Sequence, residues 1–491
     1  MNEKECTREG VQALAASGDY RMVPVWRELL SDIRTPIEAL RALQTISDHC
    51  FLLESAEESR QWGRYTFLGY DPSMELTCTG HTLTIRAGGT VRVETKHPGK
   101  YIKQVIRENR APHVEGLPPF TGGLVGYFSY DYIQYAEPSL CFRAEDPFGF
   151  RDVDLMLFDK VIAFDNLLQK ILLIVNIPVD SLESSYNRAV LTLDQMEAVL
   201  RRGIQKSPEP GRLLEEIRPR FSRAEYCKKV EAVKQHIREG DIFQLVLSNP
   251  MEARFAGSLL DTYRILRTTN PSPYMFYFSG EVEIAGASPE TLVRVNGREV
   301  RTWPLAGTRP RGRDYAEDTA LERELLADEK ERAEHNMLVD LGRNDLGKIC
   351  EFGSVTVEKY MSVERYSHVM HIASEVKGLL RPGTTAIDAV DAVLPAGTLS
   401  GAPKIRACEL IDRLEGVRRG IYGGAIGYID FSGNLDLCIG IRLAFRKGGK
   451  VFIRSGAGIV ADSVPEKEYQ ECINKAKAVV EAIRAAGELR E

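Results

Sequence analysis

The sequence predicts an α+β fold with large mixed or antiparallel sheets and flanking helices. Short runs that are apolar, or that alternate apolar and polar residues, recur between turn residues along the whole chain. Amphipathic helical segments separate groups of these runs instead of following every strand. This pattern is typical of α+β proteins rather than of a repeated βαβ unit.

The chain up to about residue 175 is predicted to be mainly strands. The stretches that carry this prediction are 65–72, 81–88, 90–96, 124–133 and 170–177. A helix is expected over 185–204, and the following QKSPEPGRL combines Pro-Gly with polar residues, which makes it the clearest linker. We therefore expect an N-terminal subdomain of residues 1–215 and a second domain of residues 216–491.

The second part is predicted to mix long helices with strands. Helices are expected over 223–240, 314–346 and 465–486, where apolar residues recur at helical spacing. The predicted strands are 241–255, 281–288, 291–297, 299–307, 367–378, 423–431, 435–448 and 450–461.

Composition and charge exclude several classes of protein. The 491 residues are 43% hydrophobic and 27% charged, as in a soluble globular protein, and the net charge of -6 disfavours nonspecific nucleic-acid binding. No stretch approaches the ~20 apolar residues of a membrane span. The first residues, MNEKECTREG, lack the apolar core of a signal peptide, and none of the nine cysteines forms a Cys-x-x-Cys pair. A cytoplasmic protein without a disulfide framework is expected.

Two predicted helices each carry a pair of carboxylates on one face. Glu331 and Glu334 are three residues apart, as are Glu468 and Glu471, and Lys475 follows one turn later. Such pairs could bind Mg²⁺, which takes one or two carboxylates, waters and substrate oxygens. A solvated helix face with ion pairs explains the same spacing, so spacing alone leaves both interpretations open.

Three predicted turns could receive a carboxylate through backbone N–H groups, and each could equally be an ordinary turn. They are Gly307-Thr308, Thr398 ahead of a predicted helix, and Gly456-Ala457-Gly458 after a strand. Arg442 lies in an otherwise apolar strand, where a substrate carboxylate or an internal acid could pair with it. His368 and His371 would point to opposite faces of a strand, which argues against zinc and leaves an acid–base or a structural role.

Taken in order, these stretches resemble the chorismate-utilising enzymes, most closely the anthranilate synthase component I family. The matching motifs are FQLVLS, ASPETLVRV, PLAGTRPRG, DEKERAEHNMLVDLGRNDLG, SHVMH, GTLSGAPKIRA, YGGAIGY, IRLAF and GAGIVADSVPEKEYQECINKA. They span about residues 225–485, and LLES with RYTFLG extends the likeness towards the N-terminus. The resemblance implies a chorismate-binding enzyme fold with an intertwined N-terminal subdomain for tryptophan regulation and partner contacts.

The resemblance also implies roles for particular residues. Glu334 and Glu471 would hold Mg²⁺, with Glu331 and Glu468 acting through its waters. The implied chorismate contacts are Gly307, Thr308, Thr398, Tyr422, Arg442, Gly456, Ala457 and Gly458. Glu290 matches the general acid that protonates the departing hydroxyl, which requires a carboxyl kept protonated near neutral pH. His371 matches a histidine associated with pyruvate elimination, and Lys475 is predicted to be catalytic.

Two positions distinguish family members by their nucleophile. Isochorismate and salicylate synthases carry a lysine at the position of Gln244, whereas a glutamine cannot deprotonate water. Aminodeoxychorismate synthase carries a nucleophilic lysine at the position of Ala306, where an alanine leaves room for ammonia. The sequence therefore predicts anthranilate synthase chemistry. The alternatives are aminodeoxychorismate synthase, isochorismate synthase and a non-catalytic anion-binding regulatory protein.

The resemblance implies two further partners, while the net charge and the lack of a long apolar stretch predict no nucleic-acid or membrane partner. The chain has no Gly-x-Cys-x-Gly elbow, so ammonia would come from glutamine through a separate amidotransferase subunit. Tryptophan would inhibit at a second site, although the stretch after LLES is short and lacks a lysine found in some relatives. The matching residues are Glu54, Ser55, Asn270, Pro273, Tyr274, Met275, Ile426 and Tyr428, with Cys438 nearby.

Overall fold

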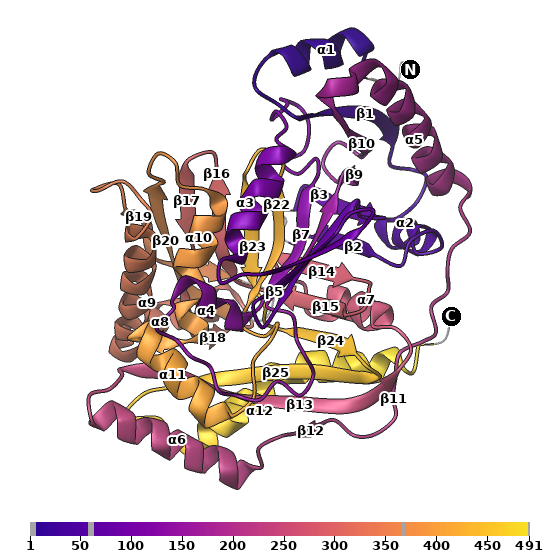
Figure 1. Cartoon of the computed structure of the whole chain (residues 1–491). Helices are drawn as coiled ribbons and strands as arrows, with labels where there is room; N and C mark the ends of the chain where they lie inside the picture. The colour runs from indigo at the N-terminus through magenta and orange to yellow at the C-terminus, as the bar shows by residue number, and fades with distance from the viewer. Residues whose placement is uncertain (1–5, 57–62, 366–368, 490–491) are drawn as a thin grey trace.

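The fold is built on two large sheets, as a computed structural model that describes residues 6–56, 63–365 and 369–489 shows. The strands of both sheets pair antiparallel, and helices flank them (Figure 1). The α+β prediction is therefore confirmed. Among the described residues, no helix is both long and apolar enough to cross a membrane.

The first sheet has 13 strands and combines strands from both halves of the chain. In sheet order they are β1 (Met22–Leu30), β10 (Lys170–Pro178), β9 (Lys160–Asp165), β3 (Tyr65–Tyr70), β2 (Cys50–Glu54), β14 (Tyr274–Phe278), β15 (Glu283–Ser288), β24 (Leu443–Lys447), β25 (Lys450–Ile459), β13 (Gln244–Ala256) and β11 (Arg212–Leu213). The short strands β12 (Arg218–Pro219) and β21 (Gly401–Ala402) also pair with β13.

The second sheet has 12 strands and is mixed in the same way. Its order is β18 (Leu305–Pro310), β20 (Val369–Leu379), β17 (Glu299–Thr302), β16 (Thr291–Asn296), β23 (Leu435–Ile439), β22 (Ala425–Asp430), β7 (Gly123–Phe128), β8 (Val153–Phe158), β4 (Met74–Thr79), β5 (Thr82–Arg86) and β6 (Thr90–Glu94), with β19 (Thr356–Arg365) beside β20. Both sheets contain strands from both sides of residue 215, so this residue does not separate one sheet from the other. The division into two domains at this residue stays a prediction.

The helices cover the sheets and connect their strands (Figure 1). They are α1 (Arg8–Ala16), α2 (Pro36–Leu43), α3 (Pro98–Glu108), α4 (Ile133–Ala136), α5 (Leu182–Arg202), α6 (Arg223–Arg238), α7 (Leu260–Thr269), α8 (Tyr315–Ala327), α9 (Glu329–Gly347), α10 (Ala386–Val393), α11 (Lys404–Glu415) and α12 (Pro465–Ala486), with a 3-10 turn η3 (Gly397–Leu399) before α11.

Helix α12 fixes one wall of the candidate site. Pro465 starts the helix, where its missing N–H costs nothing, and acidic residues occupy the first turn. Its apolar face, including Ala476, Val479 and Ile483, packs in the core of the first sheet. That packing sets the direction in which the carboxylates of the first two turns can point, since residues three or four apart share a face.

Three predicted elements are interrupted in the structure. The helix expected over 314–346 is two helices, because the Asp328 side chain accepts hydrogen bonds from the N–H groups of Lys330 and Glu331 and starts α9 there. The strand expected over 299–307 divides into β17 and β18 around Pro304, which cannot donate to a ladder. The strand expected over 435–448 divides into β23 and β24, and Arg442 lies between them with φ +53°.

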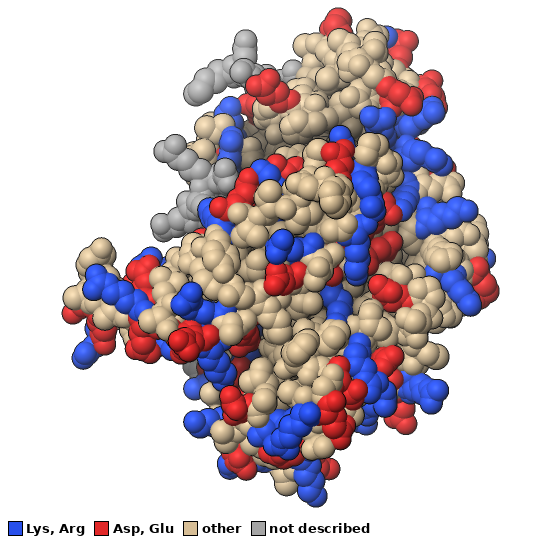
Figure 2. All heavy atoms as spheres, turned by 90° about the vertical axis from the view of Figure 1, so that its left-hand side faces the viewer, with Lys and Arg blue, Asp and Glu red and all other residues tan. Residues whose placement is uncertain are grey.

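Positive and negative side chains are interspersed over the face that Figure 2 presents. The arginines of the RPRGR stretch follow this pattern, because each is paired with a nearby carboxylate. Arg309 binds Glu324 and Asp328, Arg311 binds Asp318, and Arg313 binds Glu317. The stretch therefore presents ion pairs rather than a free basic patch.

Candidate active site

Four glutamates from α9 and α12 line the candidate site. The Glu334 carboxylate accepts a hydrogen bond from the Gln244 amide nitrogen at 3.2 Å. Burial, followed by the negative charge of Glu331, raises the pKa of Glu334. Burial also raises the pKa of Glu468, and the charge of Glu471 adds to that rise. Partly buried carboxylates whose negative charges repel one another favour a cation between them.

Lys475 supplies positive charge to this group. Its ammonium forms an ion pair of 2.6 Å with Glu471. The same charge lowers the pKa of Glu334, Glu468 and Glu290 against the effect of burial, so it lies within electrostatic reach of all three. The predicted metal and catalytic residues of α9, α12 and β13 are therefore brought together.

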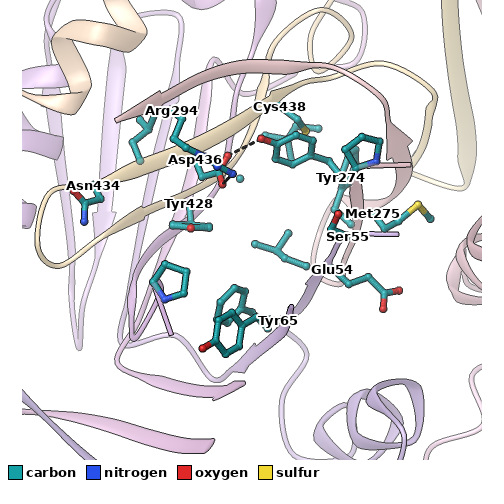
Figure 3. A pocket seen from close by; sticks show the side chains of 18 of the residues that line it. Glu54, Ser55, Tyr65, Tyr274, Met275, Arg294, Tyr428, Asn434, Asp436 and Cys438 are labelled. Carbon is teal, nitrogen blue, oxygen red and sulfur yellow. Dashed lines mark hydrogen bonds and ion pairs between the residues drawn. The ribbon is translucent and has the colours of Figure 1, made fainter. Parts of the chain in front are cut away.

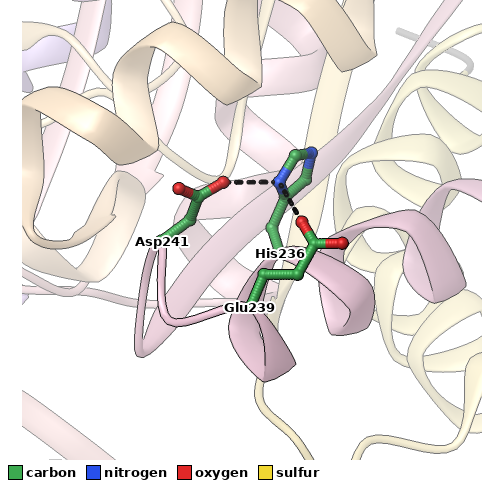
Figure 4. A group of neighbouring side chains, drawn as sticks. All are labelled: His236, Glu239 and Asp241. Carbon is green, nitrogen blue, oxygen red and sulfur yellow. Dashed lines mark hydrogen bonds and ion pairs between the residues drawn. The ribbon is translucent and has the colours of Figure 1, made fainter.

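A second group of potential metal ligands, His236, Glu239 and Asp241, lies at the end of α6 (Figure 4). In the described chain, no other three side chains of this kind have ligand atoms that all lie within 4.8 Å of one another. The His236 Nδ1 atom lies 2.7 Å from Asp241, and the same carboxylate oxygen binds the Arg406 guanidinium at 3.0 Å. The arginine already neutralises this carboxylate, so the group is an ion-pair cluster rather than a metal centre.

Glu290 lies in the short connection between β15 and β16 and is only 8% exposed. The Thr398 hydroxyl of η3 donates a hydrogen bond to its Oε1 atom at 2.9 Å. Burial raises the pKa of Glu290 to about 8, against the smaller lowering effects of Thr398 and Lys475. The carboxyl is therefore mostly protonated at pH 7, as a general acid requires.

His371 of β20 faces Gly307, which lies within the neighbouring strand β18. Its Nδ1 atom lies 2.8 Å from the Gly307 carbonyl oxygen and 3.1 Å from the Thr308 hydroxyl. A carbonyl only accepts, so Nδ1 carries the proton and the ring lone pair is on Nε2. Burial lowers the pKa of His371, and the charges of Arg442 and Lys475 lower it further, although the carbonyl opposes them. His368, the other histidine of this motif, lies outside the described residues.

The turn predicted at Gly307-Thr308 is instead a β-bulge within β18, where the pairing with β20 shifts register. The backbone of this bulge requires a glycine. Its φ of +65° is in the left-handed region, which glycine adopts without strain. A Cβ atom there would also lie 3.1 Å from the Glu331 carboxylate. Ala306 pairs with Ile372 immediately before it, so a methyl group is the only side chain at this position.

Gln244, the first residue of β13, is buried beside the carboxylates. Its Nε2 atom donates to Glu334, and its Oε1 atom is buried without a hydrogen-bond partner in the described part of the chain. A Cβ atom on Gly458 would come within 2.7 Å of Nε2, so the glycine makes room for this amide.

The local structure predicted at two further candidate substrate contacts is wrong, while their role as contacts stays a prediction. Gly456, Ala457 and Gly458 do not form a turn of free N–H groups: they lie within β25 and pair with β13. Arg442 is not in a strand, and its guanidinium donates to the Lys475 carbonyl oxygen. Long-range pairing between β13 and β25, which local sequence does not encode, accounts for the first error.

The residues matched to tryptophan binding surround a separate cavity of about 290 Å³ (Figure 3). Strands β2, β3 and β14 of the first sheet form one wall, and β16, β22 and β23 of the second form the other. Of the matched residues, Glu54, Ser55, Pro273, Tyr274, Met275, Ile426, Tyr428 and Cys438 line it. Asn270 does not line it and instead ends α7.

This cavity also contains a polar cluster that sequence reasoning missed. The Tyr274 hydroxyl donates to Asp436 at 2.7 Å and lies 3.1 Å from the Thr291 hydroxyl, while Arg294 forms an ion pair with Asp436. The Glu54 carboxylate is bound by Tyr263 and Arg267 of α7. Charged residues at alternate positions of apolar strands were the only sequence signal for such a cluster.

Comparisons with known proteins show the family of the chain. A family model described as chorismate binding enzyme matches residues 48–481, so the chain belongs to the chorismate-binding enzymes. Within that family it is similar to anthranilate synthase component 1 of Acetivibrio thermocellus, with 46% identity over 96% of this chain and 97% of the relative.

Solved structures give the same result. The crystal structure of anthranilate synthase component I from Streptococcus pneumoniae has a TM-score of 0.76 and 38% identity, and the match covers 92% of this chain and 99% of that one. A menaquinone-specific isochorismate synthase from Escherichia coli has a TM-score of 0.70 at 20% identity, covering 97% and 98% of the two chains. The second likeness concerns the fold alone.

Proposed function

We propose that the chain is the large subunit of an anthranilate synthase, which converts chorismate and ammonia to anthranilate and pyruvate. The observation that carries the proposal is the pair of side chains at the nucleophile positions. Gln244 offers an amide and Ala306 a methyl group, so the site supplies neither a base for water nor a covalent nucleophile. The relatives named anthranilate synthase component 1 support the same assignment.

Glu334 and Glu471 would hold Mg²⁺, with Glu331 and Glu468 close by. The raised pKa values of Glu334 and Glu468, caused by burial and by the charges of Glu331 and Glu471, support this assignment. Bound Mg²⁺ would neutralise a substrate carboxylate and help to orient the ring. Lys475 would then be displaced from its pairing with Glu471 towards the substrate.

The chain's own residues account for the proton movements. Glu290, protonated at neutral pH, would donate its proton to the hydroxyl as that group leaves and ammonia adds to the ring. His371, neutral and held through Nδ1 by Gly307, would serve the later elimination of pyruvate. Tyr422, Arg442 and Thr308 would bind and orient chorismate.

The first expected result is that the purified chain uses ammonium but not glutamine. Chain, chorismate, Mg²⁺ and ammonium at mildly alkaline pH should yield anthranilate, seen by its fluorescence, together with an equal amount of pyruvate. Activity should rise with pH as NH₃ replaces NH₄⁺. Isochorismate or aminodeoxychorismate as the product would select an alternative enzyme, and no product from folded protein would favour the regulatory-protein alternative. Glutamine-dependent activity would contradict the separate amidotransferase subunit.

A cytoplasmic location and a separate amidotransferase subunit complete this proposal. All nine cysteines are unpaired, which supports a reducing compartment. Ammonia released by a glutaminase would reach Gln244 and Ala306 without passing through bulk water if the two subunits associate.

The second expected result concerns His371. If this side chain serves mainly the elimination, His371→Met should release 2-amino-2-deoxyisochorismate while anthranilate formation falls about a hundredfold or more, as for loss of a proton-transfer group. Chromatography of the quenched reaction measures both compounds. An equal fall in both would contradict the assigned step.

We also propose that tryptophan inhibits by binding in the cavity between the two sheets. The lining joins Ser55 and Met275 of the first sheet to Tyr428 of the second, so a ligand there would contact both. The Tyr274 hydroxyl lies within hydrogen-bond distance of Thr291, which follows Glu290 in the chain. A shift of Tyr274 on tryptophan binding would therefore change the position of the general acid. If tryptophan prefers an arrangement of these strands that binds chorismate less well, it must weaken chorismate binding, and chorismate must weaken tryptophan binding by the same factor.

The third expected result is that Ser55→Phe relieves tryptophan inhibition. A phenyl group would fill part of the 290 Å³ cavity, so the tryptophan concentration for half inhibition should rise about tenfold or more, while kcat stays within about twofold. Ser184→Phe, at an exposed position of α5, is the matched control and should be inhibited like wild type. Equal inhibition of all three proteins would remove Ser55 from the site.

A further inference from the structure

A second cavity, of about 420 Å³, shares no lining residue with either site described above. Segments far apart in the sequence form it: the loop at 146–150, the residues around β12, and the paired strands β13 and β25. In Figure 1, β12 runs beside β13 at the lower edge of the molecule. The volume lies in the range of small-molecule sites, about 300–1,000 Å³.

One wall of this cavity is aromatic. Phe148 and Phe452 meet edge to face with ring centroids 4.5 Å apart, and Phe445 stacks on Phe452 at 5.1 Å. Phe150 joins the cluster at 5.6 Å from Phe452. Such ring clusters accept a further ring edge-on or offset, with a gain beyond simple burial.

Two arginines that line the cavity carry positive charge that neighbouring carboxylates leave largely unpaired. The exposed Arg220 side chain makes no hydrogen bond or ion pair with any residue that the structure describes. Among the described residues, Arg418 has one ionic partner, Asp152, at a distance of 3.6 Å, which leaves most of its donors for other groups.

Two of the four acidic residues that line the cavity form ion pairs with cations outside it. Glu215 binds Arg254, and Glu252 binds Lys450. The Asp146 carboxylate accepts from the Phe150 N–H, and Glu216 is exposed. The polar groups that remain available to a ligand are therefore mainly cationic.

A network of buried side chains connects the floor of the cavity with the proposed chorismate site. Arg454 and Arg419 line the cavity, and both bind the buried Glu415 carboxylate, at 2.6 and 2.9 Å. The Arg419 guanidinium lies over the Tyr422 ring at 5.6 Å. Movement of these side chains would therefore change the position of the Tyr422 ring.

We propose that this cavity binds a small aromatic carboxylate, with its ring against the phenylalanine wall and its carboxylate at Arg220 and Arg418. Occupancy displaces the Arg454–Glu415–Arg419 network and changes chorismate binding at Tyr422. The binding stands independently, whereas the effect on chorismate rests on the proposed function. Anthranilate, the proposed product, belongs to this chemical class.

The test of binding uses 4-fluorobenzoate and ¹⁹F NMR on the whole chain. Tryptophan and chorismate, each at a concentration well above its Kd in the presence of the other and without ammonium, keep the probe out of the other two sites. Wild type should bind the probe saturably with a Kd of about 0.1–1 mM, as expected of one small ring with one charge. Arg220→Glu should weaken binding at least about tenfold. Arg223→Glu, an exposed arginine outside the cavity, is the matched control and should stay within about twofold of wild type.

Three outcomes would overturn the site: no saturable binding to wild type, equal binding to Arg220→Glu, or equally tight binding of the neutral 4-fluorobenzamide. The effect on chorismate is tested separately through KM, which the probe should change in wild type and Arg223→Glu but not in Arg220→Glu. An unchanged KM in wild type would overturn the coupling. If the chain makes no anthranilate at all, the binding measurements still decide the site, so the two proposals fail distinguishably.

Discussion

Glu334→Ala is expected to lower Mg²⁺-dependent turnover of chorismate by about a thousandfold or more, which corresponds to ~4 kcal/mol of transition-state stabilisation. The substitution removes a charge and a ligand from a site where Mg²⁺ has few protein ligands to lose. Steady-state rates at several Mg²⁺ concentrations measure the effect. The fold should survive. Burial raises the pKa of Glu334, which means that the folded state disfavours the charged carboxylate, so its removal costs little stability.

Two controls make this expectation specific. Thermal unfolding of Glu334→Ala in the absence of Mg²⁺ should match wild type, which separates loss of the site from loss of the fold. Glu481→Ala removes an exposed carboxylate from the same helix as Glu471 and should leave turnover unchanged. Glu334→Ala with near-normal, Mg²⁺-dependent activity would contradict the metal assignment.

The elements with strong local signals could be predicted from the sequence. Helix α12 begins at Pro465 and ends at Ala486, as its starting proline and helical periodicity predict. The fold class and the carboxylate faces of α9 and α12 followed from the same kind of pattern. Motif resemblance, rather than spacing, selected Glu290 and Gln244 as functional residues. In the structure Gln244 donates a hydrogen bond to Glu334, and Glu290 lies within electrostatic reach of Lys475.

The remaining features depend on contacts between distant segments. Asp328 interrupts a helical pattern because its side chain caps α9, and a capping aspartate and a surface aspartate look alike in sequence. Gly458 lies in a strand because β13 pairs with it, and its space is filled by Gln244, more than two hundred residues away. The cavities form where both sheets or separate loops meet, which local periodicity does not specify.

Glu290→Gln is expected to lower kcat for the ammonia-dependent reaction by about a hundredfold to ten-thousandfold, the usual contribution of a general acid. The glutamine keeps the size and can still accept the Thr398 hydrogen bond, but it has no proton to give to the leaving hydroxyl. Rates at fixed free NH₃ measure this loss without the effect of ammonium ionisation. Near-normal activity of Glu290→Gln would remove the general acid from the mechanism.

The pH dependence gives the same residue an independent test. Wild-type kcat at constant free NH₃ should be level at neutral pH and fall above about pH 8, because the pKa of Glu290 is raised to about 8 and only the protonated carboxyl donates. The Thr398 hydroxyl stabilises the charged carboxylate, so Thr398→Val should raise this pKa and move the fall to higher pH. Glu290→Gln should lose the fall altogether, since its amide does not titrate. A fall at an unchanged pH in all three proteins would show that another group controls it, and Glu290 would then have no role as the acid.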